Sequence, residues 1–177
     1  MIIKKQSGFT LIEVIITVAI AGILLSIGLP SFNSLIQKNK MTSLHNELLS
    51  SLSLARNTAI SRGSFATLCK SNQAATDCDS SASWDDGWIV FSDINNNGAV
   101  DSGEAIIAVN NDLPENISIS FSRGRVTYGA QGYANGYNGV FTFCDDRGDE
   151  EKKGMIISGS GHIRVATSES ELEECSN

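Results

Sequence analysis

The chain has 177 residues, of which 41% are hydrophobic, 19% are charged and 7% are aromatic, and its formal net charge is −7. This length accommodates one compact domain of about 100–150 residues with an extension, and it excludes two large domains. The composition excludes a disordered or collagen-like chain. The acidic balance argues against a nucleic-acid footprint spread over the surface.

An apolar run extends from Phe9 to Leu29, and Glu13 is its single charged residue. As a helix rising about 1.5 Å per residue, this run spans about 31 Å, which is enough to cross the hydrocarbon core of a bilayer. Lys4 and Lys5 precede it, so the positive-inside bias predicts a cytoplasmic N-terminus and an exported remainder. No small-residue cleavage site follows the run, which favours a retained anchor over a removed secretory signal.

A plain anchor does not account for Glu13, because a carboxylate near the bilayer centre costs about 2.5–3.5 kcal/mol and usually has a partner. Together with the short basic leader, the string Gly8-Phe9-Thr10-Leu11-Ile12-Glu13 resembles the N-terminal signal of type IV pilins and pseudopilins. The resemblance implies that prepilin peptidase cuts between Gly8 and Phe9 and methylates the new amino terminus of Phe9. It also implies that Glu13 pairs with the Phe9 amine of a neighbouring subunit during assembly.

The helix is expected to continue to Arg62, with a kink or local break at Pro30 and a glycine cap at Gly63. His45 is expected at the surface or boundary of this helix, not as a ligand. Apolar residues recur at three- and four-residue spacing along one face, which predicts packing on a globular domain. These residues are Leu44, Leu48, Leu52, Ala55 and Ala59.

From Ser64 onward, short alternating segments are separated by Gly, Asn and Asp, the pattern of half-buried strands. The expected strands are Phe65–Lys70, Trp88–Ser92, Ala105–Val109, Ile117–Phe121, Gly139–Cys144, Met155–Ser158 and His162–Ala166. The Gly159–Gly161 connection predicts a hairpin between the last two. The sequence thus predicts an α+β fold, a long N-terminal helix packed on an antiparallel sheet. Its expected parts are a leader (1–8), a transmembrane and assembly helix (9–30), an amphipathic continuation (31–63) and a head (64–177).

The stretch Trp84-x-x-Gly87-Trp88-x-x-Phe91-x-Asp93-x-Asn95-x-Asn97-Gly98 resembles the GspH/FimT branch of the type IV pilin-like superfamily. A C-terminal run from Gly154 to Arg164 fits the same branch. The branch contains the H-type pseudopilins of type II secretion and the related FimT- or FimU-like minor pilins of type IV pili.

The four cysteines allow three pairings, among which the sequence does not choose. The absence of a CxxC pair weakens zinc and thioredoxin-type interpretations, and the expected periplasmic location favours disulfides. We favour Cys69–Cys78 as a clasp within a loop and Cys144–Cys175 as a tether for the C-terminal tail.

A loop after the second expected strand has the spacing of a calcium-binding loop, with glycine at position 6. Its oxygen-bearing residues at positions 1, 3, 5, 9 and 12 are Asp93, Asn95, Asn97, Asp101 and Glu104. Because the flanks are strand-like, the alternative is a turn whose side chains cap their own backbone, and this alternative is favoured over calcium. No other cofactor is expected.

DNA binding is a weaker hypothesis. FimT-type relatives are linked to DNA uptake through C-terminal basic residues, and the matching position here is Arg164. The segment from Cys144 to Cys175 carries nine acidic against four basic residues, which should repel phosphates. The basic spot Arg123–Arg125 is expected to be a solvated turn. His162 is expected on a structural strand, and no nucleophile motif surrounds either histidine, so no enzyme activity is expected.

The sequence therefore predicts a minor pilin or pseudopilin in the bacterial inner membrane, with its N-terminus in the cytoplasm and its head in the periplasm. Its expected partners are other pilins, prepilin peptidase and the inner-membrane assembly platform. A subunit at the tip of a type II secretion pseudopilus is the first alternative, and a DNA-uptake pilin is the second. The favoured Cys144–Cys175 pairing and the long head favour the minor pilin.

Overall fold

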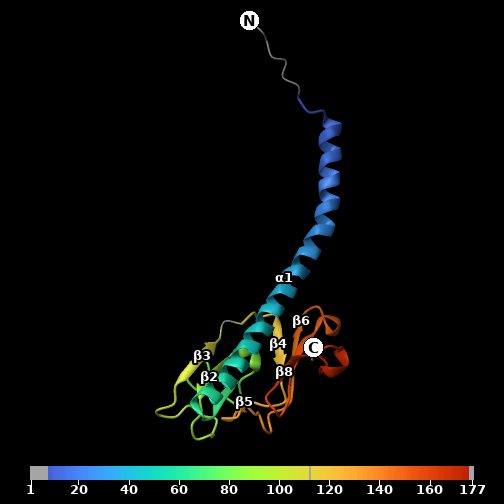
Figure 1. Cartoon of the computed structure of the whole chain (residues 1–177). Coiled ribbons are helices and arrows are strands. Elements are labelled where there is room, and N and C mark those ends of the chain that lie inside the picture. The colour runs from blue at the N-terminus through green and yellow to red at the C-terminus, as the bar shows by residue number, and fades with distance from the viewer. Residues whose placement is uncertain (1–7, 112, 176–177) are drawn as a thin grey trace. The chain divides into compact units, whose positions relative to one another are not determined.

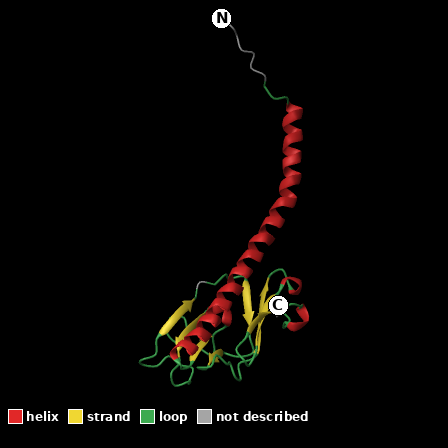
Figure 2. Ribbon diagram, in the orientation of Figure 1, coloured by secondary structure: helices red, strands yellow, loops and turns green. Residues whose placement is uncertain are grey.

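The computed structural model describes residues 8–111 and 113–175 of the chain. In these residues one long helix, α1 (Leu11–Arg62), precedes eight strands and three short 3-10 helices. The helices and strands are coloured in Figure 2. The structure divides into two compact units between Asn39 and Lys40, so the second half of α1 belongs to the same unit as the strands. The expected single helix is confirmed.

The end of α1 is fixed by a glycine. Gly63 has a φ of 63°, and its N–H donates to the Ile60 carbonyl at 3.3 Å, while the Ser64 N–H donates to the Ala59 carbonyl at 3.2 Å. This pair of bonds is the Schellman arrangement, which suits glycine because it needs a left-handed residue. The cap turns the chain directly into the first strand.

The strands form two antiparallel sheets of four (Figure 1). The first has the order β3-β2-β1-β5 and consists of β1 (Ala66–Lys70), β2 (Trp88–Ser92), β3 (Ile106–Asn110) and β5 (Arg125–Tyr128). The second has the order β4-β6-β7-β8 and consists of β4 (Ile117–Ser120), β6 (Gly139–Asp145), β7 (Lys153–Ile157) and β8 (Ile163–Val165). The 3-10 turns are η1 (Trp84–Asp86), η2 (Asp149–Glu151) and η3 (Glu169–Glu171).

One hydrophobic core joins the second half of α1 to both sheets. The predicted helix stripe is buried in full, together with Met41. Facing it are aromatic side chains of the head. Phe121, which directly follows β4, stacks on Phe141 of β6 at 4.0 Å between ring centroids, and Trp84 of η1 meets Phe141 edge-on. Burial of this stripe holds the helix on the sheets.

The prediction missed one strand. β5 pairs antiparallel with β1, so residue Arg125 begins a strand and the expected solvated turn at Arg123–Arg125 is wrong in this respect. The strand has four residues and starts with a charge, which gives too short an alternation to recognise. The hairpin between β7 and β8 is confirmed by the pairing of Ile157 with Ile163.

Candidate functional site

The first part of α1 is apolar and uncovered. Every side chain from Phe9 to Leu29 is exposed, and Phe9 is 87% exposed. Within the described residues, α1 is the one helix long and apolar enough to cross a membrane. A continuous apolar surface of this size is not stable in water and marks a segment that a membrane or a partner covers.

The expected processing junction lies immediately before this helix. Gly8 and Phe9 precede the first helical residue, and among the described residues, the chain neighbours of Gly8 aside, no atom lies within 4 Å of the position that a Cβ on Gly8 would take. The head and the rest of α1 therefore do not cover the described side of this junction. The expected leader, including Lys4 and Lys5, lies outside the described residues apart from Gly8.

Glu13 takes part in a cap at the start of α1. The Thr10 backbone N–H and hydroxyl each donate to Glu13 Oε2 at 3.4 Å, and the Glu13 N–H donates to the Thr10 hydroxyl at 3.4 Å. This reciprocal pattern is a capping box, in which a threonine cap and a glutamate three residues later satisfy the free N–H groups of the first turn. The bonds are long and the carboxylate is exposed, so it remains accessible to a cation from outside the subunit.

The sequence predicts a kink or a local break at Pro30. The helix is continuous there, so a local break is not present, and a kink stays a prediction. Proline removes one backbone donor from a helix, but the flanking apolar residues retain their own helical bonds.

Most polar side chains of the Asp93–Glu104 loop bond within the loop or to neighbouring strands, with Asp93 Oδ1 as an exception. Asp93 is fully buried, and its Oδ2 accepts bonds from the Thr67 hydroxyl at 2.7 Å and the Gly98 N–H at 3.1 Å. Its Oδ1 is buried with no hydrogen-bond partner among the described residues. The amides of Asn95 and Asn97 both donate to Asp101 Oδ2, and these bonds lower the pKa of Asp101.

The remaining ligand positions of the loop are also engaged. Glu104 accepts bonds from the Ile94 N–H at 2.6 Å and the Asp101 N–H at 3.1 Å. The Arg125 guanidinium donates to the Asn97 carbonyl at 2.7 Å and so brings a positive charge to the loop. Within the described residues, no cluster of three or more His, Cys, Asp or Glu side chains is placed to hold a metal. The geometry is that of the self-capped turn, and calcium stays a prediction of the sequence alone.

The structure contains the two favoured disulfides. Cys69 on β1 bonds to Cys78 with Cα atoms 5.7 Å apart, and Cys144 on β6 bonds to Cys175 with Cα atoms 5.8 Å apart. The tail is held further by the Glu173 N–H, which donates to the Thr142 hydroxyl at 3.1 Å. The second disulfide therefore ties the C-terminal tail to a central strand.

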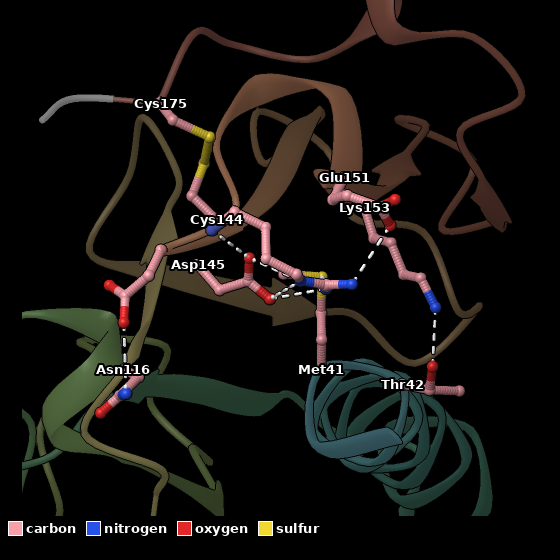
Figure 3. A network of polar contacts seen from close by, with 10 residues as sticks. Met41, Thr42, Asn116, Cys144, Asp145, Glu151, Lys153 and Cys175 are labelled. Atoms are coloured by element: carbon pink, nitrogen blue, oxygen red, sulfur yellow. Dashed lines mark hydrogen bonds and ion pairs between the residues drawn. A yellow bond between two sulfur atoms is a disulfide. The ribbon is translucent and has the colours of Figure 1, made fainter. Parts of the chain in front are cut away.

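A polar network beside this disulfide joins α1 to the second sheet (Figure 3). Arg147 pairs with Asp145 at 2.6 Å and with Glu151 at 3.2 Å, and the Asp145 side chain is almost fully buried. Lys153 donates to the Thr42 hydroxyl at 2.6 Å. Sequence reasoning missed this network, because the Asp145–Arg147 spacing is common in exposed turns.

Arg164, the candidate DNA contact, is engaged within the subunit. Its guanidinium pairs with Glu171 at 2.5 Å. The hydrogen bond from Arg164, with a second from the Thr167 N–H, lowers the pKa of Glu171 to about 2. A phosphate would have to compete with this carboxylate for the same cation.

The two histidines lie in different environments. His45 is 6% exposed, so its expected surface or boundary position is wrong. Its ring lies 5.4 Å from that of Phe143, and its Nε2 is 3.4 Å from the Gly154 carbonyl. Desolvation lowers the pKa of His45. His162 is exposed and immediately precedes β8.

A long N-terminal helix, apolar and exposed in its first part, with an antiparallel β-rich head defines a type IV pilin-like protein. The chain belongs to the GspH family: the model for the type II transport protein GspH matches residues 45–161, more than half of the chain. The model for the prokaryotic N-terminal methylation motif matches residues 3–29. Together they confirm the resemblance to the GspH/FimT branch. Pilin-like proteins of this kind are structural subunits.

Known structures and sequences agree with this assignment. Two crystal structures of the type IV minor pilin FimU from Pseudomonas aeruginosa align with TM-scores of 0.57 and 0.53, each at 18% identity. The first alignment covers 79% of this chain and 98% of FimU, and the second covers 76% and 99%. At this identity the likeness concerns the fold. The type IV major alpha-pilin of Moraxella bovis is 47% identical over 45 residues, a match that spans 25% of this chain and only 28% of that pilin's length.

Proposed function

We propose that this protein is a minor pilin, a non-enzymatic subunit of a type IV pilus-like filament. Prepilin peptidase cleaves it between Gly8 and Phe9 and methylates Phe9. Before assembly it resides in the inner membrane as a single-pass protein with its head in the periplasm. It then enters or primes a filament with other pilins on the assembly platform.

The observation that carries the proposal is the exposure of the whole apolar segment from Phe9 to Leu29. The head buries its own core without using any side chain of this segment. The apolar surface must therefore be covered from outside, first by lipid and then by the equivalent segments of neighbouring subunits.

Glu13 gives this packing a fixed register. In the separate subunit its carboxylate contacts only Thr10 through weak bonds, among the contacts that the described residues provide. In an apolar bundle this carboxylate is stable only beside a cation, and the Phe9 amine of a neighbouring subunit supplies one. A misaligned neighbour leaves both charges unpaired, so the pair selects one axial position.

The test replaces Glu13 with glutamine, which keeps the shape and hydrogen-bonding capacity of the side chain but removes its charge. We expect Glu13→Gln to insert and be cleaved normally and to enter sheared filaments at least tenfold less than the wild type, measured by immunoblot against the membrane fraction. Ser26→Ala is the matched control, because the Ser26 hydroxyl bonds only to the Ile23 carbonyl of its own helix among the described contacts. Normal incorporation of Glu13→Gln would contradict the proposal.

A second candidate is a subunit of a type II secretion pseudopilus, favoured by the description of the matching family as a type II transport protein. Deletion of the gene separates the two. Loss of surface filaments with normal protein secretion supports the minor pilin, and the reverse result supports the pseudopilin. DNA uptake is not proposed, because Arg164 is paired with Glu171.

A further inference from the structure

A small pocket opens on the head beside β5. Its volume is about 210 Å³. Aromatic rings and carboxamides line most of it, and no charged residue does, although the chain has a net charge of −7. The rings belong to Phe65, Tyr133 and Tyr137, and the amides to Asn96, Gln131 and Asn135.

The loop that carries Tyr133 is held in place by the rest of the head. The Gly129 N–H donates to the Tyr133 carbonyl at 2.9 Å, and the Gly132 N–H returns a bond to Gly129 at 2.7 Å. Arg56 of α1 donates to the Gly132 carbonyl at 3.1 Å. The loop therefore presents Tyr133, which is 52% exposed, from a fixed backbone.

The Tyr137 side chain and the Phe65 backbone are held in place as well. The Tyr137 hydroxyl accepts a bond from Arg125 Nε at 3.2 Å, and the Phe65 carbonyl accepts one from the Asp93 N–H at 3.1 Å. A preorganised site of this kind loses little conformational entropy when a ligand binds.

The lining chemistry defines the ligand. Among the described residues, no hydrogen bond engages the side-chain amides of Asn96, Gln131 or Asn135, so their donors and acceptors face a ligand or water. Amides that accept and donate suit hydroxyl groups, and aromatic faces suit the C–H faces of a saturated ring. The lack of lining charge disfavours an ionic ligand, and the volume lies below the roughly 300–1,000 Å³ of drug-sized pockets. We propose that the pocket binds one neutral saccharide ring.

The pocket is well placed for a ligand outside the filament core. It lies just beyond the C-terminal end of α1, since Phe65 follows the cap at Gly63. The part of α1 that belongs to the head, from Lys40 to Arg62, is about 33 Å long. Figure 1 shows β5 and its neighbouring loops at the end of the head where α1 terminates. Coverage of the apolar segment by lipid or by other helices does not require coverage of this pocket.

The experiment is ligand-observed saturation-transfer NMR on the full chain, kept in a zwitterionic detergent without a sugar headgroup. The probes are glucose, galactose, mannose and N-acetylglucosamine, with glucuronate as a charged comparison. We expect at least one neutral sugar to bind with a Kd of about 1 mM and glucuronate to bind more weakly. Absence of transfer to all four neutral sugars, or preference for glucuronate, overturns the proposal.

Two variants locate the binding. Tyr133→Ala should weaken the affinity at least tenfold, because it removes one stacking face from the pocket. Val109→Ala, a similarly exposed site on β3, should leave the affinity unchanged. Equal binding by wild type and Tyr133→Ala overturns the proposal. Self-association of the head that Tyr133→Ala abolishes also overturns it, because the pocket would then be part of an interface between copies of the chain. The assay needs no filament, so its outcome is independent of the assembly test on Glu13.

Discussion

The two parts of α1 contain similar residues in opposite surroundings. Leu52 is fully buried under the sheets, whereas Leu24 of the same helix is 65% exposed. In the second part, buried apolar side chains form one stripe, and the rest of the helix surface is mostly polar, with Leu54 and Ile60 as exposed apolar exceptions. In the first part they occupy every face. An apolar stripe packs on a sheet of the same chain, whereas a helix that is apolar on all sides packs in lipid or in a bundle of identical helices.

The largest expected effect on stability comes from a leucine-to-alanine substitution in the buried part of α1, compared with the same substitution in the exposed part. Leu52→Ala should destabilise the head by about 2–5 kcal/mol, because it leaves a cavity in a packed core. Leu24→Ala should leave the stability of the head unchanged. Chemical unfolding of the detergent-solubilised chain measures both, with the buried Trp84 and Trp88 as fluorescence reporters. A loss of more than about 1 kcal/mol from Leu24→Ala would mean that the first part of α1 also stabilises the head, which would contradict the difference between the two parts.

The two disulfides of the head are expected to differ in how much they stabilise it. On the chain-entropy model, replacing Cys144 and Cys175 together with alanine should cost about 3.7 kcal/mol, and replacing Cys69 and Cys78 about 2.7 kcal/mol. The difference follows from their sequence separations of 31 and 9 residues. Denaturant midpoints of the two double variants measure it. A larger loss from the Cys69–Cys78 pair would show that local strain or packing, not chain entropy, dominates.

A smaller effect is expected from the buried histidine. The pKa of His45 is lowered in the folded protein by desolvation, with Lys153 as an additional repulsive charge. Below about pH 6.5, the ordinary pKa of histidine, the unfolded chain therefore takes up a proton that the folded head resists. Stability should fall as the pH drops from neutral through this range, and His45→Gln should flatten that part of the profile. Thermal midpoints measured across the range check it, and an unchanged slope would show that His45 does not cause the loss.

The smallest effect is expected at the exposed pair of the tail. Because the pKa of Glu171 is lowered to about 2 from 4.5, its stabilising contribution is complete above about pH 4.5 and is lost as the pH falls toward 2. Glu171→Gln should remove this acid-dependent loss of stability. At neutral pH it should lower the stability of the tail by no more than the contribution of one surface ion pair. Limited proteolysis of the tail across the acidic range is the measurement. Equal protection of both proteins at every pH would contradict the role of the pair.

The sequence determined the helix and most strands because their patterns are long or strictly alternating. The stripe through Leu48 and Leu52 predicted its own burial, and Gly63 predicted the helix end. β5 was missed because four residues starting with Arg125 carry too little pattern, and the burial of His45 depends on β6 and β7, which lie far along the chain. The pocket around Tyr133 joins segments near residues 65, 96 and 135, a proximity that no local pattern encodes.

The most direct test of the central claim is the intact mass of the protein recovered from native filaments. We expect a chain that begins at Phe9 and carries one N-methyl group, so that after reduction of the two disulfides its mass exceeds that of the sequence from Phe9 by one CH2 unit and the apolar segment is retained. A mature chain that retains Met1, or one that begins beyond Leu29, would contradict the account.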